Sequence, residues 1–458
     1  MSKRRYRKIL AIVGAALAVV IAATTWFVNR KPGSPFDGVS ASTSPSKALI
    51  ERGRYVARLA DCVACHSTPH GKPFAGGLEM STPLGSIYTT NITPDKATGI
   101  GGYSLADFAR ALRHGVAGDG HRLYPAMPFP SYAKLDDADV RALYAYFMHA
   151  VRPQRQPDRK SDIAWPMNMR WPLALWSAVF TDGGTYQRNA APAGVDATLW
   201  NRGAYIVQGP GHCGSCHTPR GAVMNEKAYD GSSRQYLAGA LLDGWYAPSL
   251  RGDVNIGLGR WSQADIVRFL REGRNAHAVV YGSMTDAYNN STQFMSDADL
   301  KAIAVYLKSL PGNPKQDGPP WQYQDTPNPA LGSGAHPQAA GARLYLAKCG
   351  FCHGRDGRGQ GTWIPPLAGS VASMSRHDAS AINITLNGST HIVAQGVPDG
   401  YRMPAFRHQL SDRDVAEVLS FIRTSWGNRG GSVKPQDVKK LRQRTNPASS
   451  DVIILQMR

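Results

Sequence analysis

The chain has 458 residues, of which 42% are hydrophobic and 19% are charged, and its formal net charge at pH 7 is +19. This composition excludes a disordered chain and a polytopic membrane protein, and the length predicts two to four domains. Several of the positive charges lie in the first 31 residues, and the other Lys and Arg residues are dispersed along the chain. Without a single basic stripe, a solvated basic surface is expected and no nucleic-acid partner.

A basic cluster at the N-terminus is followed by an uncharged, mostly apolar run. The run extends from Ile9 to Val28 and contains the aromatic pair Trp26 and Phe27 near its end. It is long enough to cross a bilayer, and the basic residues before it would stay in the cytoplasm. The alternative is a cleaved signal peptide, although signal h-regions run only about 7 to 15 residues. Residues 1–31 are therefore predicted to be a transmembrane anchor or a signal peptide, and either one exports the rest of the chain.

All six cysteines lie in three copies of Cys-x-x-Cys-His, at residues 62–66, 213–217 and 349–353. On one helical turn, this spacing lets two thiols join the vinyl groups of a haem and places the imidazole beneath the iron, which is the signature of c-type haem. The sequence thus predicts three covalently bound haem c groups. The predicted tethers are Cys62, Cys65, Cys213, Cys216, Cys349 and Cys352, and the predicted axial ligands are His66, His217 and His353.

Two other readings of the motif remain open. A zinc site needs four ligands, so each motif would have to recruit a further histidine such as His70, His212 or His391. A thioredoxin-like dithiol would sit at a β-to-α junction, and no such pattern flanks the motifs.

Each motif opens a repeated helical unit. A short helical pattern leads into the motif, a second lies at residues 101–115 and 260–273 with a looser copy at 375–388, and a closing helix lies at 135–149, 295–310 and 410–426. No sustained alternation predicts a sheet, so the fold class is expected to be all-α. The predicted N-caps are Ser104, Asp136, Ser262, Ser296 and Ser411, and the predicted C-terminal stops are Gly115 and Gly273.

These repeats predict the domain boundaries. The three helical domains are expected at residues 45–150, 196–312 and 335–428. An apolar linker at 151–195 and a Pro-rich linker at 313–334 would join them, and a polar tail would follow at 429–458.

A methionine precedes the closing helix in every unit: Met127, Met284 and Met403. A thioether at the sixth position closes the iron site and raises its potential, so these residues are the predicted distal ligands. Met295 precedes its N-cap directly and is interpreted as a core residue. The methionines without a counterpart in the other units are expected to fill cores, namely Met80, Met148, Met224 and Met374.

Short proline-containing stretches recur after each motif, at residues 91–94, 248–251 and 365–367. They either line the haem edge and its propionates or form turns. The apolar stretch 164–180 in the first linker has two readings as well. Its side chains contact a partner subunit or the membrane face, or they pack between the first two units. These side chains are Trp165, Met167, Met169, Trp171, Leu173, Leu175 and Trp176.

The chain resembles the triheme cytochrome c subunit of bacterial membrane-bound, quinone-coupled dehydrogenases. The three pentads carry the resemblance, together with the stretches GSIYTTNITPDKATGIG, YPAMPFPSYAKL, NMRWPLALWSAVF, CHTPRG, NSTQFMSDADLKAIAVYLKSLP and PPLAGS. It implies three tandem class I cytochrome c-like domains. Several relatives carry a membrane-binding segment at the C-terminus, whereas the tail SSDVIILQMR is too short and polar, so the segment from Ile9 to Val28 is expected to take that role.

The resemblance also implies partners and a location. A catalytic subunit with a flavin, pyrroloquinoline quinone (PQQ) or molybdenum cofactor would oxidise an alcohol, sugar, sugar acid or aldehyde. Its electrons would pass through the three haems to ubiquinone on the periplasmic side of the cytoplasmic membrane. A small third subunit would be a further partner, and the chain would have no substrate chemistry beyond a share in quinone reduction.

Three other functions stay open at the sequence level. A self-contained haem enzyme of the peroxidase or nitrogen-oxide reductase type would need one open axial position. A haem-based sensor would need an output domain, and none is visible. A cytochrome that feeds a terminal oxidase or a nitrate-type reductase would differ only in its partners.

Overall fold

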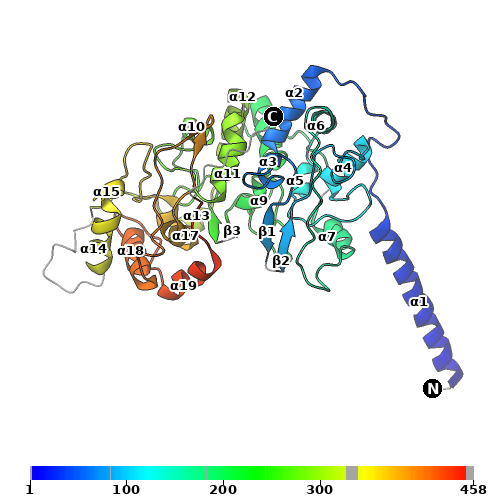
Figure 1. Ribbon diagram of the computed structural model, residues 1–458. Coiled ribbons are helices and arrows are strands. Elements are labelled where there is room, and N and C mark those ends of the chain that lie inside the picture. The colour runs from blue at the N-terminus through cyan, green and yellow to red at the C-terminus, as the bar shows by residue number, and fades with distance from the viewer. Residues whose placement is uncertain (1–2, 83, 182–183, 243, 326–338, 450–458) are drawn as a thin grey trace. The chain divides into compact units, whose positions relative to one another are not determined.

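The computed structural model describes residues 3–82, 84–181, 184–242, 244–325 and 339–449. The chain divides into two compact units, and Figure 1 labels the helices and strands along it. Unit 1 comprises Met1–Gly53 and Ala75–Tyr186, and unit 2 comprises Arg54–Phe74 and Gln187–Arg458. Parts of two predicted segments, the Pro-rich linker and the C-terminal tail, lie outside the described residues, as do the first residues of the predicted third domain.

Unit 1 contains the long N-terminal helix and the helices of the first repeat. Its elements are α1 (Lys3–Asn29), the start of α2 (Lys47–Leu59), β1 (Glu79–Thr82), β2 (Gly85–Tyr88), α4 (Leu105–His114), α5 (Phe129–Tyr132), α6 (Asp137–His149) and α7 (Pro172–Phe180). Within the described residues, α1 is the one helix long and apolar enough to cross a membrane, over Arg7–Asn29, by its length and composition. A signal sequence has the same properties.

Unit 2 contains the end of α2, the first motif helix and the second and third repeats. The second repeat has α8 (Ala197–Gln208), α9 (Gly214–His217), β3 (Ala240–Leu242), β4 (Trp245–Ala247), α10 (Gln263–Glu272), α11 (Ser283–Asn290), η1 (Thr292–Phe294) and α12 (Asp297–Ser309). The third has α14 (Ala339–Lys348), α15 (Gly350–His353), α16 (Val371–Met374), α17 (Ala379–Asn387), β5 (Val393–Ala394), β6 (Val397–Pro398), α18 (Asp412–Thr424) and α19 (Pro435–Arg444). The first motif helix is α3 (Cys62–Cys65), and α13 (Pro314–Asp317) follows α12.

The predicted helix caps are confirmed. Ser104 and Ser262 each form a capping box with the aspartate three residues on, so α4 and α10 begin where expected. The closing helices α6, α12 and α18 are capped by side chains as predicted, at Asp136, Ser296 and Ser411. Gly115 and Gly273 end α4 and α10 with φ angles of 61° and 71°, a left-handed conformation that glycine adopts without strain.

The same close crossing between the first and closing helices occurs in all three repeats. A Cβ atom at Gly53 would lie 1.9 Å from the carbonyl oxygen of Ala142. At Gly203 it would lie 2.0 Å from the carbonyl oxygen of Ala302, and at Gly341 2.3 Å from that of Glu417. These separations are too short for any side chain, so glycine allows the two backbones to touch.

The expectation of an all-α fold holds only coarsely, because each repeat also contains a two-stranded antiparallel hairpin. The pairs are β1 with β2, β3 with β4, and β5 with β6. Their strands are two to four residues long, too short to produce a visible alternation in the sequence. In the third hairpin, Gln395 and Gly396 have φ angles of 49° and 85°, as a type I′ turn requires.

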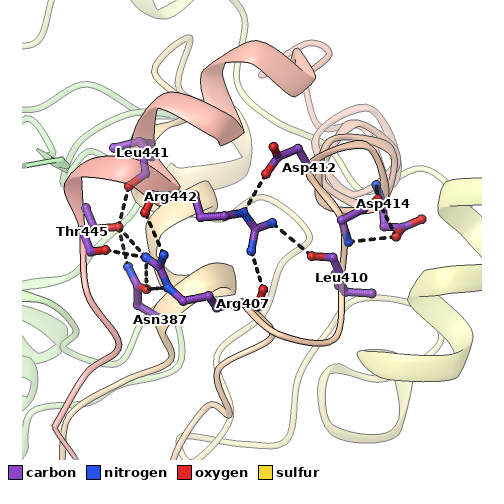
Figure 2. Close-up of polar contacts among 9 residues, drawn as sticks. Asn387, Arg407, Leu410, Asp412, Asp414, Leu441, Arg442 and Thr445 are labelled. Carbon is purple, nitrogen blue, oxygen red and sulfur yellow. Dashed lines mark hydrogen bonds and ion pairs between the residues drawn. The ribbon is translucent and has the colours of Figure 1, made fainter.

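The predicted polar tail contains helix α19, which packs against α17 and α18. Figure 2 shows the polar contacts around it: Arg442 of α19 donates to Asp412 Oδ1 at 2.7 Å, and the neighbouring Arg407 donates to Asn387 Oδ1 at 2.9 Å. The two arginines also donate to each other's backbone carbonyl. Val438 of α19 is fully buried in the core of the third repeat. Because the helix is strongly basic, its few apolar positions did not reveal it in the sequence.

Candidate haem sites

Each Cys-x-x-Cys-His motif forms one helical turn, as the sequence predicts. The backbone N–H of His66 donates to the carbonyl of Cys62 at 3.0 Å, and His217 and His353 repeat this bond to Cys213 and Cys349 at the same distance. In each motif the first cysteine is partly buried and the second is exposed. The two thiols and the imidazole of a motif thus arise from the same turn.

Two of the histidines are held in a defined orientation by proline carbonyls. The Nδ1 atom of His217 lies 2.7 Å from the carbonyl oxygen of Pro248, and Nδ1 of His353 lies 3.0 Å from that of Pro365. Because a carbonyl only accepts, Nδ1 carries the proton and Nε2 keeps its lone pair for a metal. Burial lowers the pKa of both histidines, which keeps the rings neutral. Sequence reasoning had noticed the recurring prolines but missed this role of their carbonyls.

Two of the predicted distal methionines share unit 2 with their motifs. Met284 lies at the start of α11, where it packs against the cluster of Val280, Tyr288 and Ile392. Met403 packs against the core of the third repeat, and its backbone N–H donates to Ser389 Oγ at 3.0 Å. Both thioethers are therefore partly buried among apolar groups, as a distal haem ligand needs to be.

In the first repeat, the predicted distal methionine and the Cys-x-x-Cys-His motif belong to different units. Met127 belongs to unit 1, where its backbone N–H donates to the carbonyl of Tyr124 just before α5. The motif with Cys62, Cys65 and His66 belongs to unit 2.

The residues of unit 2 fit a haem group. The second and third motifs each offer a thiol pair, an imidazole whose Nε2 is left to bind a metal, and a soft thioether, the donor set of a His/Met-ligated haem c. The hydroxyls of Thr285, next to Met284, and of Thr390, next to Ser389, are buried and have no hydrogen-bond partner within the polypeptide. Buried polar atoms without partners are rare in native proteins. They indicate that a further polar group, such as a haem substituent, belongs near these elements.

The alternative readings of the motif gain no support. Across the part of the chain that the structure describes, no three His, Cys, Asp or Glu side chains gather to hold a metal ion. Burial raises the pKa of Cys213 to about 12 and that of Cys349 to about 11. Reactive dithiols work as thiolates with lowered pKa values, so the raised pKa values give the dithiol reading no support.

The first and second motifs are neighbours within unit 2. Helix α11, which carries Met284, contacts the first motif helix α3. His212, the residue before the second motif, forms a hydrogen bond with the backbone of Ala60. Desolvation raises the pKa of Cys65 to about 12, and the nearby carboxyl of Asp61 and thiol of Cys216 add to the shift. The helical turns of the two motifs therefore lie close together.

The predictions for the methionines outside the candidate sites are confirmed for two residues and wrong for one. Met295 and Met374 are buried as predicted, whereas Met224 is 48% exposed, so its assignment to a core is wrong. Met224 lies in a loop with a positive φ of 63°, outside any helix face.

In the proline-containing stretches after the motifs, Asn91 and Arg251 donate to backbone carbonyls. Asn91 donates to Gln154, and Arg251 donates to Pro311 and Tyr236. These contacts tie the stretches to other loops, and both readings of the stretches, the haem edge and the turn, stay predictions.

Comparisons with known proteins agree with the repeated architecture. The family model for cytochrome c matches the chain three times, at residues 50–150, 201–311 and 338–426. Each match includes one Cys-x-x-Cys-His motif.

Similarity to individual proteins extends along most of the chain. The cytochrome c subunit of gluconate 2-dehydrogenase from Pantoea cypripedii is 47% identical over 91% of this chain and 95% of its own length. The cytochrome c subunit of alcohol dehydrogenase (quinone) from Gluconacetobacter polyoxogenes is 46% identical over 90% and 88%. The fructose dehydrogenase cytochrome subunit of Gluconobacter japonicus is 34% identical over 96% and 90%. The chain therefore belongs to the cytochrome c family, among the relatives of the cytochrome c subunits of alcohol, gluconate and fructose dehydrogenases, as its sequence predicted.

Proposed function

We propose that this chain is a triheme electron-transfer subunit that passes electrons from a partner dehydrogenase to ubiquinone in the cytoplasmic membrane. The observation that carries the proposal is the threefold motif turn, combined in unit 2 with a histidine whose Nδ1 is fixed by a proline carbonyl. Relatives with high identity over most of the chain are cytochrome c subunits of dehydrogenases, which supports a dehydrogenase as the electron donor.

The proposal assigns a role to each site residue. The covalent tethers are Cys62, Cys65, Cys213, Cys216, Cys349 and Cys352, the proximal ligands are His66, His217 and His353, and the distal ligands are Met127, Met284 and Met403. A bound haem supplies the one-electron chemistry. The polypeptide holds the imidazole in one tautomer, fills the sixth position with a thioether and buries the site, which together favour electron transfer over substrate chemistry.

The same proposal covers location and assembly. Helix α1 serves as an uncleaved anchor, and the three cytochrome c domains at 45–150, 196–312 and 335–428 lie on the periplasmic side. The catalytic partner contains flavin, PQQ or molybdenum, and a small third subunit completes the complex. The apolar length of α1 supports the anchor, since it is long enough to span a bilayer.

Carbon monoxide binding tests whether all three irons are closed. The gas binds reduced haem that has an open or weakly held sixth position, so the purified holoprotein is expected to show no shift of its reduced spectrum under carbon monoxide. A pyridine haemochrome assay on the same sample is expected to give three haem c groups per chain. Stoichiometric gas binding at one haem would contradict the carrier model and favour a self-contained haem enzyme.

A further inference from the structure

Unit 1 exposes a continuous apolar stretch at residues 165–179, here called the apolar segment. The exposed fraction is 77% for Trp165, 59% for Met167 and 72% for Val179. Trp171 and Leu175 are also exposed. The segment has one charged residue, Arg170. Isolated exposed apolar side chains are ordinary, whereas a contiguous set of them marks an interaction surface.

The apolar segment is built as a rigid feature of unit 1. One face of α7 packs inward: Ala174 is buried, and the Trp176 ring packs edge-to-face on Phe129 with centroids 6.1 Å apart. Just before the helix, Arg170 donates to the carbonyl of Arg122 at 2.9 Å. The opposite face of the helix, with Trp171, Leu175 and Val179 one and two turns apart, points to solvent. The exposed apolar face is therefore presented by a helix that is held in place.

The apolar segment lies beside the end of the long apolar helix. Helix α7 contacts α1 within unit 1. The chain that leaves α1 is fixed to the same body by hydrogen bonds to its backbone carbonyls. Arg122 donates to Arg30 at 3.1 Å, and Arg110 donates to Pro32 at 2.9 Å. Lys31 in turn donates to the carbonyl of Gly118 at 2.9 Å. If α1 spans the bilayer, these bonds hold α7 at the level where α1 leaves it.

We propose that the apolar segment inserts into the periplasmic leaflet of the membrane, at the boundary between lipid headgroups and acyl chains, beside α1. This inference rests on the proposed membrane anchor. Tryptophan favours this boundary. Trp165 and Trp171 of the segment would lie there together with Trp26 of α1. A helix with one apolar face and one face packed on protein lies in the plane of the surface. The exposed Arg30 and Lys31 would meet anionic headgroups. The occupant of the surface is thus phospholipid.

Spin labels at two matched valines test the inference in the full-length holoprotein. Because all six native cysteines are haem tethers in the proposed function, a Val179→Cys variant offers one reactive thiol. Val397→Cys in unit 2 is the control, since Val397 is 68% exposed and Val179 72%. Each labelled protein is reconstituted into vesicles of phosphatidylethanolamine and phosphatidylglycerol. The accessibility of the label to oxygen, which concentrates in lipid, is then compared with its accessibility to a polar nickel chelate, which stays in water.

The label at Val179 is expected to favour oxygen over the nickel chelate, and the label at Val397 is expected to do the reverse. Equal accessibility of both labels to the nickel chelate, in protein that floats with the vesicles, would overturn the inference and leave the anchor intact. Failure to float would overturn the proposed anchor and the inference with it. Shielding of Val179 from both reagents, seen only after the dehydrogenase is added, would assign the surface to that subunit and overturn the lipid assignment.

Discussion

At the scale of single residues, the hydrogen bonds at histidine Nδ1 determine which ring nitrogen can bind a metal. The carbonyls of Pro248 and Pro365 fix the tautomers of His217 and His353, so each ring presents Nε2 as a metal ligand. The cysteines and histidines could be predicted from the sequence because their chemistry requires a fixed local spacing. The proline partners could not be assigned, because the pairing depends on a loop that returns to the motif 31 and 12 residues later.

Replacing a distal methionine tests the ligand assignment. In Met403→His, an imidazole takes the place of the thioether, so the potential of one haem is expected to fall by a sizeable part of the roughly 0.8 V that axial ligands span. A redox titration followed in the haem absorption bands measures the change. Met295→Leu is the matched control, because Met295 is a buried core methionine outside the proposed sites, and all three potentials should be retained. Three unchanged potentials in Met403→His would remove Met403 from the ligand set.

At the scale of elements, local signals predicted helix ends well and short hairpins poorly. A cap such as Ser411 and its partner Asp414 are three residues apart, so the sequence alone reveals them. The strands of β5 and β6 are two residues long, and α19 depends on contacts of Arg442 with Asp412, 30 residues away. These elements are stabilised by packing against the rest of the domain, and the periodicity of their own residues is too short or too polar to predict them.

The helix crossing makes its own prediction. In Gly203→Ala, the new Cβ would lie 2.0 Å from the carbonyl oxygen of Ala302, so α8 and α12 have to separate. The expected loss of unfolding free energy is about 1–3 kcal/mol or more, as for overpacked cores. Thermal denaturation followed by far-UV circular dichroism measures it. Gly400→Ala is the control, since nothing lies within 4 Å of its Cβ position, and its melting temperature should stay close to that of the parent protein. Equal melting of both variants would refute the close crossing.

At the scale of the whole molecule, the second and third repeats share one compact unit. Asn289 of α11 donates to the carbonyl of His391 at 3.0 Å and accepts from the backbone N–H of Val393 at 2.9 Å. Arg274, after α10, forms a buried ion pair with Asp399 of the third repeat. Tyr246 of β4 stacks on His377 with centroids 4.3 Å apart. These contacts connect the two repeats, so they are expected to unfold together.

Removing the buried ion pair should weaken this coupling. Asp399→Ala leaves the Arg274 charge buried and unpaired, which costs about 3–5 kcal/mol in comparable cases. The parent protein is expected to unfold in denaturant in a single transition, followed by haem absorption. In Asp399→Ala this transition is expected to shift and to split into two steps. Asp356→Ala is the control, because Asp356 and Arg358 form an exposed pair 3.4 Å apart whose loss should be nearly neutral. A variant of Asp399 as stable as this control would show that the pair does not join the repeats.

The sequence by itself determined the three attachment motifs, their helical units and the family, because these depend on residues close together in the chain. Only the tertiary structure decided which carbonyls contact the motif histidines and which repeats share a compact unit. It brought Pro248 to His217, placed α11 against the first motif helix α3, and put α7 beside α1. Such contacts join residues far apart in the chain, and their free energy comes from burial and hydrogen bonds that form only when the chain has folded.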